Sequence, residues 1–202
     1  MRALTAATCA ALTAGLGLAA APPAFAQRSS CAHTGSRTVL STAAARVYYT
    51  AAWRPYSCYR ITGRRVPLDM FVDRFYARRD ARLGLLRTTG RILAYTWIDP
   101  GIPAVYVHSV DMRLARFHRR AKVAPVVSGQ PSAVRVSDLV ARRSGAVGWI
   151  QRVEGETSVW RYDARGRRRL DAGAGIRLAS LRLSRARMVW SRGGARRSAA
   201  LR

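Results

Sequence analysis

The sequence predicts an all-β fold made of repeated four-stranded antiparallel modules. The clearest copy lies between positions 136 and 171, where short apolar segments alternate with polar turns. Two of these turns contain Gly145 and Gly166, and glycine readily adopts the positive φ that tight hairpins need. The expected strands of this copy are 136–140, 146–151, 158–162 and 168–171.

Three weaker copies of the pattern fill most of the remaining chain. The first is expected to have strands at 38–41, 47–50, 57–61 and 65–68, and the second at 83–88, 92–98, 104–108 and 113–117. The last copy, with strands at 180–183, 188–190 and 197–201, ends before a fourth strand. Segment 70–82 is expected to be a connection, with a short helix or an extra strand as alternatives. Segment 119–132 is expected to be a polar linker.

Aromatic residues in the second strands indicate the repeat length. Tyr49, Tyr95, Trp149 and Trp190 are 46, 54 and 41 positions apart. A four-stranded unit of about 40–50 residues is typical of a β-propeller blade. The sequence therefore predicts an incomplete or small β-propeller-like array of about three and a half four-stranded antiparallel blades, whereas propellers close with about four to eight. A β-sandwich of the same strands is the alternative.

One repeat resembles a known family. The segment TGRILAYT at 89–96, followed by the apolar segment 104–107 and Asp111, resembles the β-propeller repeat of the TolB type. In that family a glycine turn precedes a strand that ends in an aromatic residue, and an apolar strand and an Asp/Gly hairpin follow. Segments 143–149 and 160–166 have the same pattern. The resemblance covers most of residues 37–201 and implies a propeller built from such blades.

The N-terminus is typical of a secretory signal peptide. Arg2 precedes the apolar run 6–21, and Ala24-Phe25-Ala26 forms an A-x-A cleavage site before Gln27. We therefore expect a signal peptide over 1–26, cleaved after Ala26, and a single secreted, extracellular domain over 27–202. No second apolar stretch is long enough for a transmembrane helix.

Two cysteines remain in the expected mature chain. Cys31 and Cys58 are predicted to form a disulfide because an exported protein folds under oxidising conditions; two free buried thiols are the alternative. The bond would close a loop of about 27 residues, stabilise the fold by about 3.5 kcal/mol, and pin the N-terminal arm to the first module. We expect no metal site and no cofactor, because the spacings C-x-x-C and H-x-x-x-H are absent.

The charge is strongly basic, with 36 Lys and Arg against 10 Asp and Glu and a formal net charge of +26. Lys122 is the only lysine. This balance predicts binding to an anionic polymer or cell-surface component; the alternative is a compositional bias that only keeps the surface soluble. The candidate anion-binding residues are Arg142, Arg143, Arg165, Arg167, Arg168 and Arg169. Trp160 and Tyr162 are near enough in sequence to add stacking. In the alternative interpretation, the two aromatic rings pack between blades and the arginines are simply solvated.

No catalytic residue is assigned. The chain has no G-x-S-x-G motif, and His108 and His118 are expected to be strand-end or surface residues. Asp99, Asp111 and Asp163 lie in expected turns, where aspartate caps its own backbone. We therefore expect a secreted, non-enzymatic interaction or scaffold module. The alternatives are an extracellular hydrolase acting on a cell-wall or polymer substrate, and an inactive remnant of a longer propeller.

Overall fold

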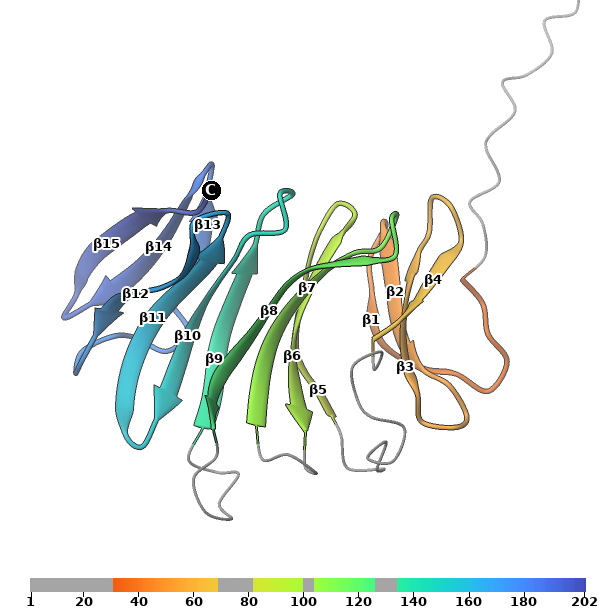
Figure 1. The fold of residues 1–202 in the computed structure, drawn as a ribbon, viewed down its shortest axis with the longest axis horizontal. Coiled ribbons are helices and arrows are strands. Elements are labelled where there is room, and N and C mark those ends of the chain that lie inside the picture. The colour runs from red at the N-terminus through yellow and green to blue at the C-terminus, as the bar shows by residue number, and fades with distance from the viewer. Residues whose placement is uncertain (1–30, 69–81, 100–103, 126–133) are drawn as a thin grey trace, which may run out of the picture.

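The computed structural model describes residues 31–68, 82–99, 104–125 and 134–202, which form strands and no helix. The strands make four antiparallel sheets that follow one another along the molecule (Figure 1). In each sheet, strands adjacent in sequence are also adjacent in space, so every sheet is a simple meander. The predicted all-β fold of antiparallel modules is confirmed. The expected signal peptide lies outside the described residues.

We name the sheets A to D in chain order. Sheet A contains β1 (Arg37–Ser41), β2 (Ala45–Tyr49), β3 (Pro55–Tyr59) and β4 (Arg64–Pro67). Sheet B contains β5 (Arg82–Thr89), β6 (Ile92–Asp99), β7 (Ala104–Asp111) and β8 (Arg116–Pro125). Sheet C contains β9 (Val134–Ala141), β10 (Val147–Val153), β11 (Glu156–Asp163) and β12 (Gly166–Ala172). Sheet D contains β13 (Arg182–Ser184), β14 (Arg187–Arg192) and β15 (Ala195–Ala200).

The expected boundary at the end of sheet B is wrong. We predicted a strand ending at 117 and a linker from 119, but β8 pairs with β7 as far as Pro125. Ala121 and Val123 are buried between sheets B and C, and the basic residues Arg119, Arg120 and Lys122 beside and between them hid this alternation. Long basic side chains suit an edge strand because their stems cover apolar surface while the charge stays in water. Segments 69–81 and 126–133 lie outside the described residues. The first of them holds the other expected connection, 70–82, except Arg82, which begins β5.

A separate apolar core fills each space between neighbouring sheets. One core joins A to B, a second joins B to C and a third joins C to D. Tyr95, Trp149 and Trp190 each point from a second strand into the core shared with the preceding sheet. Sheet A has no preceding sheet. There the aromatic residue on the equivalent face of the second strand is Tyr48, not Tyr49, so the expected register is shifted by one position. A shift of one residue reverses the face on which a strand side chain lies.

Side chains also connect the sheets through hydrogen bonds. The Tyr95 hydroxyl donates to the carbonyl oxygen of Leu68 at 3.0 Å, which joins sheet B to the end of sheet A. Thr89 Oγ1 donates to the carbonyl oxygen of Ala141 at 3.0 Å, which joins the ends of β5 and β9. These contacts explain why the meanders hold a defined order instead of sliding over an apolar interface.

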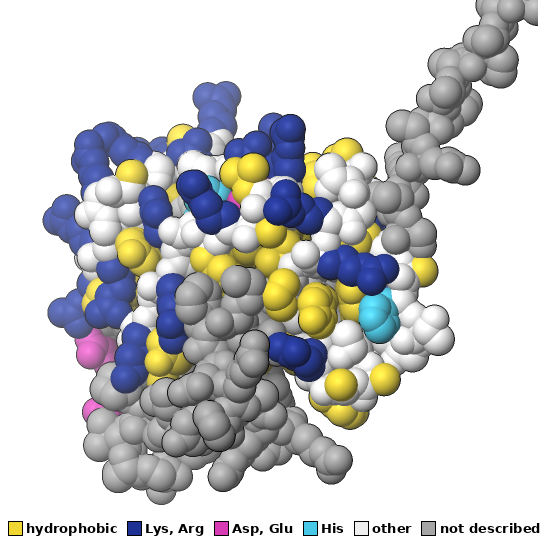
Figure 2. All heavy atoms as spheres, turned by 45° about the vertical axis from the view of Figure 1, so that its right-hand side comes forward, with side chains coloured by type: hydrophobic (Ala, Val, Ile, Leu, Met, Phe, Trp, Pro, Cys, Tyr) yellow, Lys and Arg dark blue, Asp and Glu magenta, His cyan; other side chains and the backbone are white. Residues whose placement is uncertain are grey.

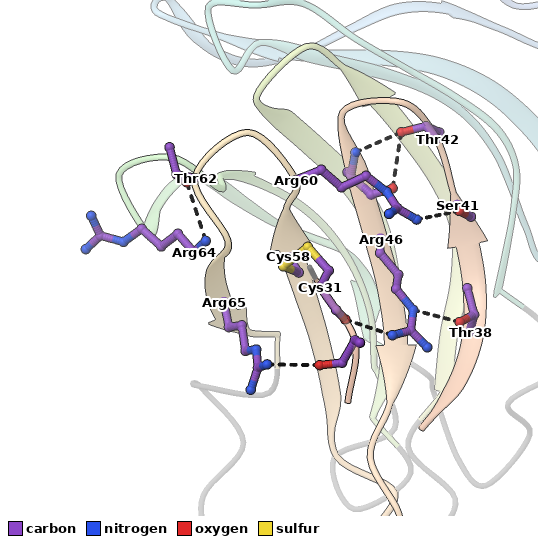
Figure 3. The surroundings of a disulfide bond; sticks show 12 residues. Cys31, Thr38, Ser41, Thr42, Arg46, Cys58, Arg60, Thr62, Arg64 and Arg65 are labelled. Atoms are coloured by element: carbon purple, nitrogen blue, oxygen red, sulfur yellow. Dashed lines mark hydrogen bonds between the residues drawn. A yellow bond between two sulfur atoms is a disulfide. The ribbon is translucent and has the colours of Figure 1, made fainter. Parts of the chain in front are cut away.

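The outer face of sheet A is covered by the N-terminal arm (Figure 3). The predicted disulfide between Cys31 and Cys58 is formed, with 5.8 Å between the Cα atoms, and both sulfurs lie beside buried Tyr48. Arg46 Nη1 donates to the Cys31 carbonyl at 2.7 Å, and Arg65 Nη2 donates to the Ala32 carbonyl at 3.0 Å. The arm therefore covers the face of sheet A that has no neighbouring sheet.

Sheets A and D are the two ends of the row (Figure 1). Sheet D has three strands, and within the described ranges no core cluster joins it to sheet A, so these residues form no closed ring. A search of the same residues finds no helix suited by length and hydropathy to crossing a bilayer.

Candidate anion-binding site

The predicted arginines fall into two groups on sheet C. Arg142 and Arg143 lie in the β9–β10 turn and Arg165 in the β11–β12 turn. Both turns are at the same end of the sheet, since Val147 at the start of β10 pairs with Tyr162 near the end of β11. Arg142 is half-buried and donates to the Leu201 carbonyl, so its guanidinium helps to hold the end of sheet D. Arg143 and Arg165 are exposed.

The second group lies on β12, the edge strand of sheet C. The guanidinium of Arg167 is 4.9 Å from the centroid of the Trp160 ring and donates to the carbonyl of Lys122 on β8. Arg169 Nη1 lies 3.5 Å from Glu156 Oε1. Side chains alternate along a strand, so Arg168 projects to the opposite face. The structure therefore divides the expected continuous run of arginines between two faces of one strand.

Strand β8 contributes basic residues that the sequence analysis assigned to a linker. The Arg119 guanidinium lies 5.4 Å from the centroid of the Tyr162 ring, and its Nη1 donates to the His118 carbonyl at 2.8 Å. Because Arg167 reaches the Lys122 backbone, the edges of sheets B and C meet here. We call Arg119, Trp160, Tyr162, Arg167 and Arg169 the outer-edge cluster. The Lys122 side chain is not part of it, because Ala121 and Val123 face sheet C and the side chain between them projects to the opposite face of β8.

The aromatic rings of the outer-edge cluster hold arginines instead of offering free faces. Trp160 stacks on Trp149 with 6.3 Å between centroids and 10° between planes, and Arg167 lies over the Trp160 ring. Both Trp160 and Tyr162 pack against the core between sheets B and C. The alternative in which the rings pack between sheets is therefore correct for them. A guanidinium stacked in this way keeps its edge outward, so the N–H groups that do not bond to the backbone can contact an oxyanion.

The charge in the outer-edge cluster is unbalanced. Arg119, Arg167 and Arg169 provide three positive charges, and the nearby acid that contacts them is Glu156. Arg167 and Arg169 are exposed, while Arg119 is half-buried. Figure 2 shows that basic side chains also spread over much of the face in view and that acidic side chains are few. The outer-edge cluster is distinguished by its geometry rather than by the presence of arginine alone.

The two histidines in sheet B are enclosed by neighbours. His108 stacks on Tyr95 with 5.0 Å between ring centroids. Burial, with a smaller contribution from Arg120, lowers the pKa of His108 to about 3. His118 Nε2 lies 3.7 Å from Asp111 Oδ2, a His–carboxylate pair of the kind that a hydrolase uses.

Asp111 is already occupied by structural contacts. Its Oδ2 lies 2.7 Å from Arg91 Nε, and its Oδ1 accepts backbone N–H groups from Arg113 and Leu114. Asp163 accepts the backbone N–H of Arg165 in the equivalent turn of sheet C. The predicted turn-capping role is therefore confirmed for Asp111 and Asp163, while the Asp99 side chain is not among those described. Over the described ranges, no group of three or more His, Cys, Asp or Glu side chains is arranged to hold a metal ion.

Comparison with known proteins finds similarity only at the level of structure, and that similarity is low. The chain matches no family model and no curated protein. Among solved structures it is similar to part of PorZ, described as an essential bacterial surface component of the type-IX secretion system of human oral-microbiomic Porphyromonas gingivalis. The identity is 15% and the TM-score 0.41, and the match covers 77% of this chain and 19% of the PorZ chain.

Proposed function

We propose that this protein is an exported, non-enzymatic interaction module that binds anionic polymers or surfaces through the outer-edge cluster. The observation that carries the proposal is the convergence of Arg119 from β8 with Arg167 and Arg169 from β12, where Arg167 also reaches the β8 backbone. Multivalent cationic sites of this kind match a polymer that repeats its negative charge along one direction. The disulfide between Cys31 and Cys58 supports the exported location, since such bonds persist in oxidising compartments.

The proposal includes a propeller-like arrangement of the four sheets, with each sheet acting as a blade of the TolB-type repeat. Sequential meanders, a core between each neighbouring pair and the backward-pointing aromatic residues support it. In such an array each blade packs on the next, so the Arg119 side chain on β8 reaches Tyr162 on β11 and the Arg167 side chain on β12 reaches back to β8. The non-enzymatic part is supported by Asp111, because its contacts with Arg91 and two backbone N–H groups occupy both carboxylate oxygens.

Retention on immobilised heparin in a salt gradient tests the binding site. We expect the variant Arg165/Arg167/Arg168/Arg169→Gln to elute at clearly lower salt than the native protein, because it loses four charges, two of them in the outer-edge cluster. The matched control is Arg37/Arg135/Arg177/Arg196→Gln, which removes four exposed arginines from positions outside the outer-edge cluster.

The control separates a specific site from bulk charge. If the outer-edge cluster binds, the control elutes close to the native protein and well after the Arg165/Arg167/Arg168/Arg169→Gln variant. Equal elution of the two variants would contradict the proposal, because retention would then depend on net charge alone. Circular dichroism of both variants confirms that each keeps its β structure.

A further inference from the structure

A cavity of about 210 Å³ lies at the edge of the molecule formed by the first strands of three sheets. Its walls come from β5 of sheet B, β9 of sheet C and the region around β13 of sheet D. These strands are at the opposite sheet edges from β8 and β12. The cavity is therefore separate from the outer-edge cluster.

A buried carboxylate lies at the centre of the cavity wall. Asp138 is 4% exposed, its Oδ1 accepts the backbone N–H of Leu139 at 2.9 Å, and its Oδ2 accepts that of Leu181 at 2.9 Å. The Leu181 contact also ties the segment before β13 to β9. Both oxygens are used by the backbone, so the position of the carboxylate is set by the fold.

Two arginines flank this carboxylate from opposite sheets. Arg87 Nη2 lies 3.7 Å from Asp138 Oδ1, and Arg182 Nη1 lies 3.6 Å from Asp138 Oδ2. Arg87 Nη1 also donates to the Leu86 carbonyl at 3.0 Å, and Arg182 Nη1 donates to the Leu181 carbonyl at 2.7 Å. Each backbone contact uses one N–H group of its guanidinium, while the distances to Asp138 exceed those of good hydrogen bonds.

The arrangement leaves a net positive charge and unused donors beside an apolar wall. Two guanidiniums face one carboxylate, and a guanidinium has five N–H donors, of which these contacts use few. The side chains of Arg87 and Arg182 are 49% and 71% exposed, so they can turn toward a ligand at the rim. The apolar side chains that reach the surface of this wall are Val140 and Leu183, because Leu139 and Leu181 are buried in the neighbouring cores.

We propose that this cavity binds a carboxylate group carried on a short apolar chain. Arg87 and Arg182 bind the carboxylate through charge-assisted hydrogen bonds, and the side chains of Val140 and Leu183 contact the apolar part. The volume is below the roughly 300–1,000 Å³ of sites for complete small-molecule ligands. The cavity therefore admits a small carboxylic acid, or one such group at the end of a larger molecule.

An NMR titration of the ¹⁵N-labelled protein tests this assignment with three probes. Pentanoate has both features, pentanamide lacks the charge and acetate lacks the apolar chain. We expect pentanoate to shift backbone signals of β5, β9 and β13 and to bind at least about tenfold more tightly than either of the others. Equal affinities for pentanoate and pentanamide would overturn the proposal.

Single substitutions then assign the contact residues. Arg87→Gln and Arg182→Gln are each expected to weaken pentanoate binding by about tenfold, whereas the exposed control Arg37→Gln leaves it unchanged. An equal loss in all three variants would show a nonspecific charge effect and overturn the site. Arg87→Gln and Arg182→Gln are not expected to impair heparin retention more than the control, so this test and that of the proposed function can fail independently.

Discussion

Gly145, in sheet C, packs directly against Ser109 and His118 of sheet B. It lies in the β9–β10 turn with φ +83°, and its carbonyl accepts a hydrogen bond from buried Ser109 Oγ at 2.7 Å. A Cβ atom at this position would lie 2.6 Å from His118 Cγ. Glycine is therefore required here for two independent reasons: the positive φ of the backbone and the close approach of the His118 ring.

Replacing this glycine tests that close packing. We expect Gly145→Ala to lower the free energy of unfolding by about 2–3 kcal/mol, because it adds a clash with His118 to the cost of a positive φ. Gly155→Ala is the matched control, since Gly155 has φ +87° and nothing within 4 Å of the added Cβ. Urea denaturation should show a loss of only about 1 kcal/mol for the control. Equal losses would mean that the His118 contact has no energetic effect.

His108 makes stability sensitive to acid. Its pKa in the folded protein is lowered to about 3 from an ordinary value of 6.5, mainly by burial. Between about pH 6.5 and pH 3, His108 is protonated in the unfolded chain but neutral in the folded protein. The contribution of His108 to the free energy of unfolding is therefore fully present above pH 6.5 and is lost as the pH falls toward 3. The total effect is at most about 5 kcal/mol.

The variant His108→Phe keeps an aromatic ring in the stack and removes the titrating group. We expect its urea midpoint to change much less between pH 7 and pH 4 than that of the native protein. Exposed His33 offers a control, and His33→Gln should retain the native acid sensitivity. A native-like slope in His108→Phe would show that other groups cause the acid sensitivity.

The apolar and aromatic side chains at the outer surfaces of the sheets are covered by neighbouring elements. On sheet A, the arm held by the disulfide covers Tyr48, which would otherwise be an exposed apolar face. On β8 and β12, arginine stems cover aromatic rings at the sheet edge. Charged side chains on an edge strand also oppose pairing with a second molecule. The same arginines can therefore protect the edge and bind anions.

Removing the disulfide should destabilise the N-terminal arm and sheet A more than the other sheets. We expect Cys31→Ser/Cys58→Ser to lower the free energy of unfolding by about 3.5 kcal/mol, because the unfolded chain regains the freedom of the closed loop. Hydrogen exchange should accelerate most in sheet A and least in sheet D. The native protein under reducing conditions serves as the control and should behave like the variant. Uniform acceleration in all sheets would contradict a local role.

At the scale of the whole molecule, each sheet packs mainly on its neighbours in sequence. Stability in such a row depends on the sheets and on the interfaces between successive pairs, as in repeat proteins. The net charge of +26 acts over the whole surface and favours adhesion to anionic surfaces at low salt. The heparin comparison therefore requires two variants of equal charge, since only the position of the lost arginines can report a site.

Much of the architecture could be predicted because hairpin glycines and alternating apolar residues act locally. The strand order within each sheet and the pairing of Cys31 with Cys58 are examples. The extent of β8 could not be predicted, because its buried residues alternate with basic ones that are typical of a linker. Register in sheet A was wrong by one residue, since Tyr48 and Tyr49 are adjacent aromatics and only packing against the arm decides which points outward.

The sequence by itself determined the all-β class, the four modules, the disulfide and the basic charge, because these follow from periodicity, turn residues and composition. Only the tertiary structure decided which charges act together. It brought Arg119 beside Arg167, and Asp138 between Arg87 and Arg182, from strands far apart in the chain. Such neighbours are set by how whole sheets pack on one another, and no local pattern of residues encodes that.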